Sequence, residues 1–412
     1  MAPVVRALEA DPNFDSKLCL TAQHRDMLDQ IVDLFELTPD YDLDIMRPGQ
    51  SLTEVTTRVL EGLAPILDAE KPDWVLVQGD TTTAMAGSLS AFYHGVQVGH
   101  VEAGLRTWNK AHPFPEEVNR RMAGVLADVH FAPTDWAASN LAREGTPLER
   151  VFVTGNTVID ALQRVAEIPF DAAGTALEEI PVGEKRIVLV TAHRRENFGS
   201  GMQQICEGIR TAADENPDAH FVCPVHLNPS VQVLYRYLDD LPNVSLIPPL
   251  DYRPMVWLLQ NCSLVVTDSG GLQEEAAGFG KPVLVLRETT ERPEGVNAGT
   301  ARLVGTHAGR LQYWISHLLQ DEAAYARMSQ AHNPYGAGDS AEQVVEILGG
   351  SEAVVPFSHS LEGIAEDLVA EADVPHHAHE SIPGSPPRRR ITTRRSDPPW
   401  LRQRVVAQRT RA

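Results

Sequence analysis

Three carboxylates in the first half of the chain have the type and position needed to move a proton at carbon. Asp80 follows the apolar run 74–77, Glu102 follows the run 97–101, and Glu116 begins a helix-like segment. Open α/β sheets place their chemistry at such strand ends. Burial and like charges raise the pKa of some carboxylates, so a general acid and a general base can coexist there near neutral pH. The pattern therefore predicts acid–base chemistry.

Each carboxylate also has a structural interpretation, and its position alone does not decide between the two. Asp80 could cap the helix that follows it. Acids are favoured in a first helical turn, so one of Glu116 and Glu117 could serve the helix only. Glu102, close to Arg106 in the sequence, would be costly to bury without a partner or a purpose.

The second half of the chain offers groups that could bind a diphosphate. The run 267–275 reads Thr-Asp-Ser-Gly-Gly-Leu-Gln-Glu-Glu and joins an apolar strand to a helix-like segment. Its glycines let the backbone approach a ligand, and the N–H groups of a helix N-terminus face negative charge. Glu275, one turn into that helix, could accept hydrogen bonds from sugar hydroxyls. Clusters around His193, His226 and Arg292 follow other strands, and together these groups predict a diphosphate site. A plain tight turn and structurally satisfied histidines are the alternatives.

These side chains need a scaffold, and strand-like and helix-like segments alternate along both halves of the chain. The predicted strands are 17–21, 74–77, 97–101, 129–132, 150–153, 187–191, 220–224, 244–247, 264–267 and 282–286. The predicted helices are 2–8, 26–35, 51–69, 82–93, 116–126 and 202–215. The alternation predicts an α/β fold with parallel sheets.

Two Rossmann-like, doubly wound domains with the ligand in the cleft between them are the natural assembly of these elements. We expect the domains at 1–165 and 185–348, joined by a linker at 166–184 that is rich in Pro, Gly and acid. Residues 349–412 lack periodicity, and we expect them to be disordered. Their last 25 residues hold nine arginines, which could bind nucleic acid or a membrane surface, or have no function.

The charged residues and the cysteines of the chain indicate what kind of host, partner and compartment the protein has. The 412 residues include 56 acidic and 35 basic side chains, for a formal net charge of −21, and only five are lysines. Such a chain predicts a halophilic host, since a GC-rich genome would explain scarce lysine but not excess acid. The same charge argues against a nucleic-acid partner. Four scattered cysteines, no apolar run of about 20 residues and no leader-like start predict a cytoplasmic protein without a metal site or a membrane partner.

In their order along the chain, these clusters resemble the non-hydrolysing UDP-N-acetylglucosamine 2-epimerases. The segments that carry the resemblance are 21–25, 78–83, 101–106, 113–120, 154–162, 192–197, 224–229, 267–275, 288–294 and 333–336. The resemblance implies a glycosyltransferase-B-like fold, a homodimer, and interconversion of UDP-GlcNAc and UDP-ManNAc without NAD or metal. The implied route is anti elimination of UDP to 2-acetamidoglucal, then syn re-addition. The product would supply surface polysaccharide or glycoprotein synthesis.

The resemblance also implies roles for individual residues. The catalytic residues that it implies are Asp80, Glu102, Glu116 and His193. The substrate-binding residues that it implies are Gln23, Arg106, His226, Leu250, Met255, Ser269, Gly270, Gly271, Glu275 and Arg292. Leu250 and Met255 fall where the family lines its uracil pocket.

Two features depart from the family pattern. Family members usually begin with a strand and a Gly-Thr-Arg-Pro-Glu loop, which carries an Arg and a Lys used at the site and would precede Met1. We therefore expect the true start to lie upstream, and little activity from a chain that begins at Met1. Residues 23–27 and 48–50 differ from the pattern of members that bind a second UDP-GlcNAc, so we do not expect allosteric activation by substrate.

Three rival functions are kept beside the epimerase. A retaining glycosyltransferase of the same fold would need an acceptor site rather than three carboxylates at one centre. A non-catalytic UDP-sugar binder would bind UDP without exchanging the C2 proton. A hydrolysing relative would release free ManNAc and UDP.

Overall fold

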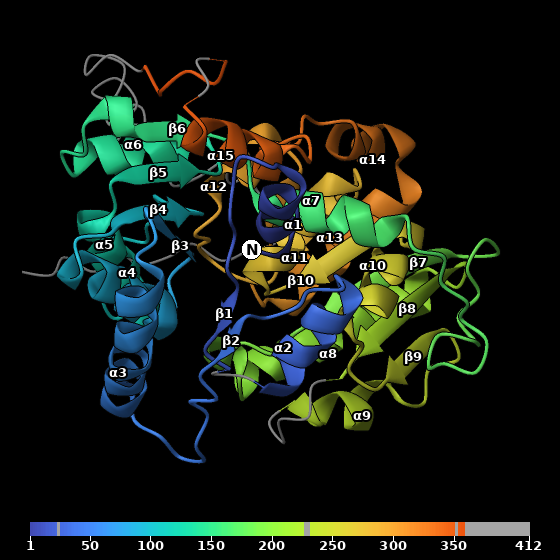
Figure 1. The fold of residues 1–412 in the computed structure, drawn as a ribbon. Coiled ribbons are helices and arrows are strands. Elements are labelled where there is room, and N and C mark those ends of the chain that lie inside the picture. The colour runs from blue at the N-terminus through green and yellow to red at the C-terminus, as the bar shows by residue number, and fades with distance from the viewer. Residues whose placement is uncertain (23–24, 226–230, 351–352, 359–412) are drawn as a thin grey trace, which may run out of the picture. The chain divides into compact units, whose positions relative to one another are not determined.

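The computed structural model describes residues 1–22, 25–225, 231–350 and 353–358, which form an α/β fold with parallel sheets (Figure 1). One sheet has four strands in the order β3-β4-β5-β6, and the other has six in the order β12-β11-β10-β7-β8-β9. Two short strands, β1 and β2, pair with each other in parallel. This architecture confirms the predicted fold class. Within the described ranges, no helix has the length and apolar character needed to cross a membrane.

Most predicted strands and helices are found within one or two residues of their expected bounds. The strands are β1 (Cys19–Leu20), β2 (Tyr41–Asp42), β3 (Trp74–Gln78), β4 (Gln97–Val101), β5 (Val129–Ala132), β6 (Val151–Val153), β7 (Arg186–Thr191), β8 (Ala219–Pro224), β9 (Val244–Ile247), β10 (Leu264–Thr267), β11 (Val283–Val285) and β12 (Ala301–Leu303). The helices up to β7 are α1 (Ala2–Ala10), α2 (Arg25–Leu34), α3 (Leu52–Glu70), α4 (Thr82–Tyr93), α5 (Glu116–Leu126), α6 (Asp135–Arg143), η1 (Leu148–Arg150) and α7 (Thr157–Ala166). Those after β7 are η2 (Arg195–Asn197), α8 (Ser200–Glu215), α9 (Val233–Leu238), α10 (Tyr252–Asn261), α11 (Gly270–Gly278), α12 (Pro293–Ala298), α13 (Ala308–Gln320), α14 (Glu322–Ser329) and α15 (Ser340–Leu348).

The strands β7, β10 and β11 of the six-stranded sheet are buried on both faces, which explains why they are nearly continuous apolar runs. Alternate residues of β7 point to opposite faces. Val188 belongs to a core that includes Met202 of α8 and Leu311 of α13. Leu189 belongs to a second core that includes Leu258 of α10 and residues of α11. Helices on both faces therefore exclude water from the sheet and leave its strand ends as the accessible edge.

The strand order of this sheet reverses between β7 and β10. The chain runs outward through β7, β8 and β9, then returns to the other side of β7 and continues through β10, β11 and β12. Ligands of doubly wound sheets bind in the crevice that such a reversal opens at the carboxyl ends of the strands. Among the described strands of the four-stranded sheet, by contrast, spatial order follows chain order.

The last helix of the described chain packs with the four-stranded sheet. Val344 of α15 belongs to the apolar cluster that contains Val4 of α1 and Phe131 of β5. The Ala341 N–H donates to Asp160 Oδ1 of α7 at 2.7 Å. Residues up to α15, within the range expected for the second domain, thus return to the first sheet. Part of the expected tail is ordered as well, because the Phe357 N–H donates to the carbonyl that begins β6 and its ring is buried.

Candidate active site

The ends of β3 and β4 bring two of the predicted carboxylates to one turn. The Gly79 N–H donates to the Val101 carbonyl at 3.0 Å, which ties the turn after β3 to the end of β4. Gly79 has a φ of +69°, and a Cβ atom there would lie 2.9 Å from Glu102 Oε2. Asp80 follows Gly79 directly in the chain. Asp80 and Glu102 therefore flank a turn that only glycine fits without strain.

Glu102 has a strained backbone and a carboxyl with an unusual affinity for protons. Its φ of +59° lies in the left-handed region that residues with side chains rarely adopt. Burial is the main cause that raises the pKa of its carboxyl to about 7, and the charge of Glu274 adds to the rise. The charges of Arg292 and Arg120 oppose it. Near neutral pH this carboxyl can both give and take a proton.

The interpretation of Asp80 as a helix cap is wrong. Thr81 caps α4, because its hydroxyl accepts the Ala84 N–H at 3.1 Å. The Asp80 carboxylate instead pairs with Arg120, whose Nε donates to Oδ2 at 3.1 Å, while Asn119 Nδ2 donates to the Asp80 carbonyl at 3.0 Å. The Asp80 side chain keeps 27% of its surface exposed, so a ligand can reach it.

Glu116 and Glu117 begin α5 in different surroundings. Glu117 is buried, and its two oxygens accept the backbone N–H groups of Thr107 and Trp108, each at 3.0 Å. Glu116 is only half-buried. Of the two acids, Glu117 has the structural environment, and Glu116 is the candidate for chemistry.

Arg106 is not brought to these carboxylates. Its side chain has no exposed surface. The guanidinium donates to both carboxylate oxygens of Glu144, at 3.1 and 2.7 Å, and to the Leu105 carbonyl at 2.7 Å. The structure therefore shows Arg106 in a buried ion pair with Glu144, and its contact with substrate stays a prediction.

A second group of predicted residues lies at the reversal between β7 and β10, around Asp268. This fully buried carboxylate accepts hydrogen bonds at Oδ2 from the His193 and Arg194 N–H groups, at 2.9 and 2.8 Å. The Asn197 side-chain amide donates to the same oxygen at 3.0 Å. Asp268 thereby fixes the loop after β7 to the turn after β10. The His193 ring is exposed, and its Nε2 lies 3.8 Å from Asp268 Oδ1.

The turn after β10 continues into the N-terminus of α11. Ser269 is the N-cap residue, and its N–H donates to the Thr267 hydroxyl at 2.9 Å. A Cβ atom on Gly270 would lie 2.9 Å from Arg292 Nη1, so glycine lets the guanidinium approach the backbone. A Cβ atom on Gly271 would meet nothing within 4 Å. Helix N–H groups beside a cation, with open space next to them, suit an anion.

Arg292 joins this group to the carboxylates of the four-stranded sheet. Its Nε donates to Glu274 Oε1 at 2.6 Å, and its Nη1 lies 2.9 Å from Glu291 Oε1. Its Nη2 lies 3.7 Å from Glu102 Oε1. Despite burial, these carboxylates raise the pKa of Arg292, which keeps the guanidinium charged. Against the effect of burial, Arg292 and Arg287 in turn hold the pKa of Glu291 at about 2.

The remaining predicted residues lie beside α10 and α11. Leu250 and Met255 are half-buried and pack against the apolar cluster that contains Leu272. Burial raises the pKa of Glu275 to about 7, and the neighbouring Tyr252 hydroxyl opposes the rise. Half-buried apolar side chains with a buried carboxyl nearby suit a heterocycle with hydroxyl groups attached.

Two predicted binding residues, Gln23 and His226, lie outside the described residues. Other residues take part in the site although the sequence analysis did not single them out. Asn156 Nδ2 donates to Glu274 Oε2, and Thr134 Oγ1 donates to Glu294 Oε1 at 2.6 Å. These pairs connect the end of the first βα series to the segments around Arg292. Asn156 lies in the segment 154–162 that carries the family resemblance, and each of the two residues stands just before a helix; these are the signals that could have drawn attention to them.

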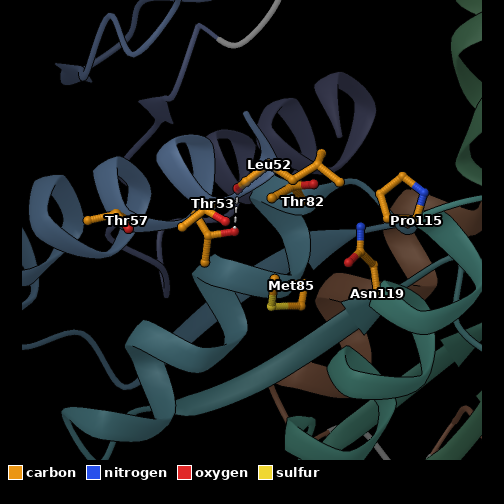
Figure 2. Close-up of a pocket in the computed structure, with 8 residues that line it drawn as sticks. Leu52, Thr53, Thr57, Thr82, Met85, Pro115 and Asn119 are labelled. Carbon is orange, nitrogen blue, oxygen red and sulfur yellow. Dashed lines mark hydrogen bonds between the residues drawn. The ribbon is translucent and has the colours of Figure 1, made fainter. Parts of the chain in front are cut away.

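A cavity of about 290 Å³ adjoins the carboxylates without containing them (Figure 2). It is lined by residues of α3, α4 and the start of α5, namely Leu52, Thr53, Thr56, Thr57, Thr82, Met85, Pro115 and Asn119. Asn119 connects the two places, since its side-chain amide also donates to the Asp80 carbonyl. The cavity is therefore adjacent to the turn that carries Asp80.

Known proteins resemble this chain over most of its length. Residues 6–349 match the family model described as UDP-N-acetylglucosamine 2-epimerase. Proteins of that name from Salmonella typhimurium and Escherichia coli (strain K12) are 54% and 52% identical to it, over 84% of this chain and 94% of theirs.

Solved structures agree with the sequence comparison. The Neisseria meningitidis UDP-GlcNAc 2-epimerase bound to UDP-GlcNAc is 46% identical, with a TM-score of 0.79 over 85% of this chain and 96% of that one. S. aureus MnaA bound to UDP is 42% identical, with a TM-score of 0.78 over 87% and 96%. The predicted resemblance is confirmed, and the chain belongs to the UDP-N-acetylglucosamine 2-epimerase family.

Proposed function

We propose that this chain is a non-hydrolysing epimerase that interconverts UDP-GlcNAc and UDP-ManNAc. The observation that carries the proposal is the junction of Glu102 with Arg292, 3.7 Å apart. It places a carboxyl that titrates near neutral pH beside a cation at a helix N-terminus. Epimerisation at C2 through elimination requires that pairing, because a proton must leave C2 while a diphosphate leaves C1.

The forward half of the reaction is an elimination. A carboxylate among Asp80, Glu102 and Glu116 takes the C2 proton, and the electron pair of the C2–H bond forms the C1=C2 double bond of 2-acetamidoglucal. The C1–O bond breaks and its electron pair leaves on the β-phosphate of UDP. Arg292, His193 and the N–H groups at the start of α11 stabilise the charge on that leaving group.

The return half rebuilds the sugar with the other configuration. A carboxylic acid of the same cluster protonates C2 from the opposite face, and a β-phosphate oxygen of UDP forms the new bond to C1. Every step is redox-neutral, so the route needs no hydride carrier. Glu102, with a pKa of about 7, can hold the proton in either direction. A closed cleft would retain the glucal until UDP returns.

The nucleotide is held by the second group of residues. Leu250 and Met255 are proposed to line the uracil pocket, and Glu275 to accept hydrogen bonds from ribose hydroxyls. Ser269 and the two glycines after it contribute backbone donors to the diphosphate. In this assignment the sugar faces the Glu102 turn, and the proximity of Arg292 to Glu102 supports it.

Proton NMR of UDP-GlcNAc incubated in D₂O at high salt with the protein, and in parallel with a chain extended upstream of Met1, tests the proposal. The expected product is UDP-ManNAc with deuterium at C2. Free ManNAc with UDP would show a hydrolysing enzyme instead. Bound UDP without C2 exchange would favour a sugar-nucleotide binder or a glycosyltransferase.

We also propose a homodimer that forms through the outward face of α5. Val118, Met122 and Val125 follow one another on one side of this helix, and all three are exposed. Phe114, just before the helix, is exposed as well.

Light scattering should report a dimer that Val125→Asp dissociates. Val355→Asp is the control, since Val125 and Val355 are 86% and 74% exposed. An unchanged dimer in Val125→Asp would exclude this face.

The cellular setting is inferred from the proposed product and from charge. An activated ManNAc serves surface polysaccharide or glycoprotein synthesis, and its precursor is a cytoplasmic nucleotide sugar. The net charge of −21 suits a halophilic cytoplasm. After gene deletion, we expect hydrolysed surface polymers to lack ManNAc. On cell fractionation, we expect the protein in the cytosol. Unchanged polymers would contradict the first inference, and membrane-bound protein the second.

A further inference from the structure

Arg120 is buried and donates hydrogen bonds to two carboxylates, those of Asp80 and Glu117. Its Nε and Nη2 both donate to Asp80 Oδ2, and its Nη1 donates to Glu117 Oε2 at 3.1 Å. The Arg120 side chain is only 5% exposed. Both arms of the guanidinium are engaged inside the protein, and little of the side chain is accessible to substrate.

Glu117 is fixed in turn by the loop between β4 and α5. One of its oxygens accepts the Thr107 N–H and the other accepts the Trp108 N–H, each at 3.0 Å. A carboxylate with two backbone donors and an arginine has little freedom to reorient. The result is a chain of charge-assisted hydrogen bonds that runs from this loop through α5 to the turn of Asp80.

We infer that Arg120, which Glu117 holds in place, is a positioning residue for Asp80, and that its positive charge favours the ionised form of Glu102. The inference deepens the proposed epimerase function and rests on it. Arg120 aims the Asp80 carboxylate at the substrate. Its charge also limits how strongly the site retains a proton on Glu102.

The charges around Glu102 set the sign of the effect. The charged groups that face it are Glu274, Arg292, Asp80, Arg120 and the amino group of Met1. Arg120 pairs with Asp80, and Asp80 follows Gly79, whose Cβ position lies 2.9 Å from Glu102 Oε2. Across this short path the guanidinium charge opposes the rise in the pKa of Glu102, so removing that charge should make the carboxyl hold its proton to higher pH. Removing the charge of Glu117 should do the reverse, because Arg120 then loses a compensating anion.

The test is the pH dependence of kcat for C2 deuterium exchange in the full chain. Arg120→Met should lower kcat on the order of 100-fold with little change in KM. It should also move the limb of the kcat–pH profile that Glu102 causes near pH 7 to higher pH. Glu117→Gln should move that limb to lower pH. Arg120→Lys keeps the charge but loses the fork, so the limb should stay in place while kcat falls.

Arg121→Met is the matched control, since Arg121 is the next residue, is 52% exposed and pairs with Glu144 instead. Its pH profile should equal that of the unmodified protein. A limb that stays unmoved in both Arg120→Met and Glu117→Gln would overturn the inference and leave a structural arginine. If Arg120→Met does not fold, Glu117→Gln carries the test. Absence of exchange, both in the unmodified protein and in a chain extended upstream of Met1, would instead refute the proposed function.

Discussion

Arg292 Nη2 and Glu102 Oε1 lie 3.7 Å apart, although Glu102 follows β4 of the four-stranded sheet and Arg292 follows β11 of the six-stranded one. The cation also contacts Glu274 and Glu291, so the negative charge around it exceeds its own. This guanidinium connects Glu102, one of the carboxylates proposed for proton transfer, with the turn proposed for the diphosphate.

The first prediction concerns the planar guanidinium of Arg292, which can donate to two acceptors at once. Arg292→Lys keeps the charge but cannot engage Glu274 and a phosphate oxygen with one planar group, so affinity for UDP should fall about 10-fold or more. Isothermal titration calorimetry measures it. Arg310→Lys, an exposed arginine 3.9 Å from Glu288, should bind UDP normally. Equal affinities in the two variants would remove Arg292 from the diphosphate site.

The second prediction concerns the glycine beneath Glu102. In Gly79→Ala the new methyl group would lie 2.9 Å from Glu102 Oε2, which should displace the carboxyl and lower the C2 exchange rate at least about 10-fold. Gly95→Ala is the matched control, because Gly95 has a φ of +70° against +69° for Gly79 and has no atom within 4 Å of its Cβ position. Both variants bear the backbone strain, so equal exchange rates would show that the Glu102 contact does not matter.

The sequence predicted the placement of Asp80 and Glu102 well, because parallel neighbouring strands end at one edge of a sheet. It predicted strands such as β7 and β10 for a related reason, since strands buried on both faces are continuous apolar runs. The strands β1 and β2 are two residues each. β1 lies inside the predicted strand 17–21, whereas β2 was missed because two residues are too few to show a period of two.

Contacts made across the sheet reversal could not be predicted. Asp268 anchors His193 because β10 lies beside β7, and strand order is not written in local sequence. The ion pair of Arg106 could not be predicted either, because a motif does not say which way a side chain points. Its burial against Glu144 depends on α6, which the sequence analysis did not predict.

The third prediction concerns acid stability. Burial lowers the pKa of His130 to about 3, and the charge of His100 adds to the effect. Below about pH 6.5 this histidine therefore binds a proton in the unfolded chain but stays neutral in the folded protein. The free energy of unfolding consequently falls as the pH drops toward 3. Glu102 and Glu275, whose pKa values are raised, act in the opposite direction between about pH 4.5 and 7.

A variant isolates the histidine from those carboxyls. His130→Leu should remove up to about 1.4 kcal/mol of stability change per pH unit between about pH 6 and 4. Urea unfolding at several pH values measures it. His332→Leu, at an exposed position, should keep the original slope. A His130→Leu slope equal to that of the unmodified protein would mean that His130 can be protonated in the fold.

The fourth prediction follows from net charge. With 56 acidic against 35 basic residues, self-repulsion should weaken as salt shortens the Debye length from about 10 Å at 0.1 M to about 3 Å at 1 M. The midpoint of thermal unfolding should therefore rise by several degrees between these KCl concentrations. Sucrose at equal osmolality is the control, because it is excluded from protein surfaces but screens no charge. A rise with sucrose as large as with KCl would argue against screening.

The account depends most on Glu102 moving the C2 proton. The measurement that tests it most directly is the rate of C2 deuterium incorporation into UDP-GlcNAc by Glu102→Gln, with UDP affinity measured on the same sample. Glutamine keeps the shape but cannot exchange a proton in this way, so we predict a rate at least about 100-fold lower and an affinity for UDP changed by no more than a few-fold. Exchange at the unmodified rate, with UDP bound as before, would contradict the account.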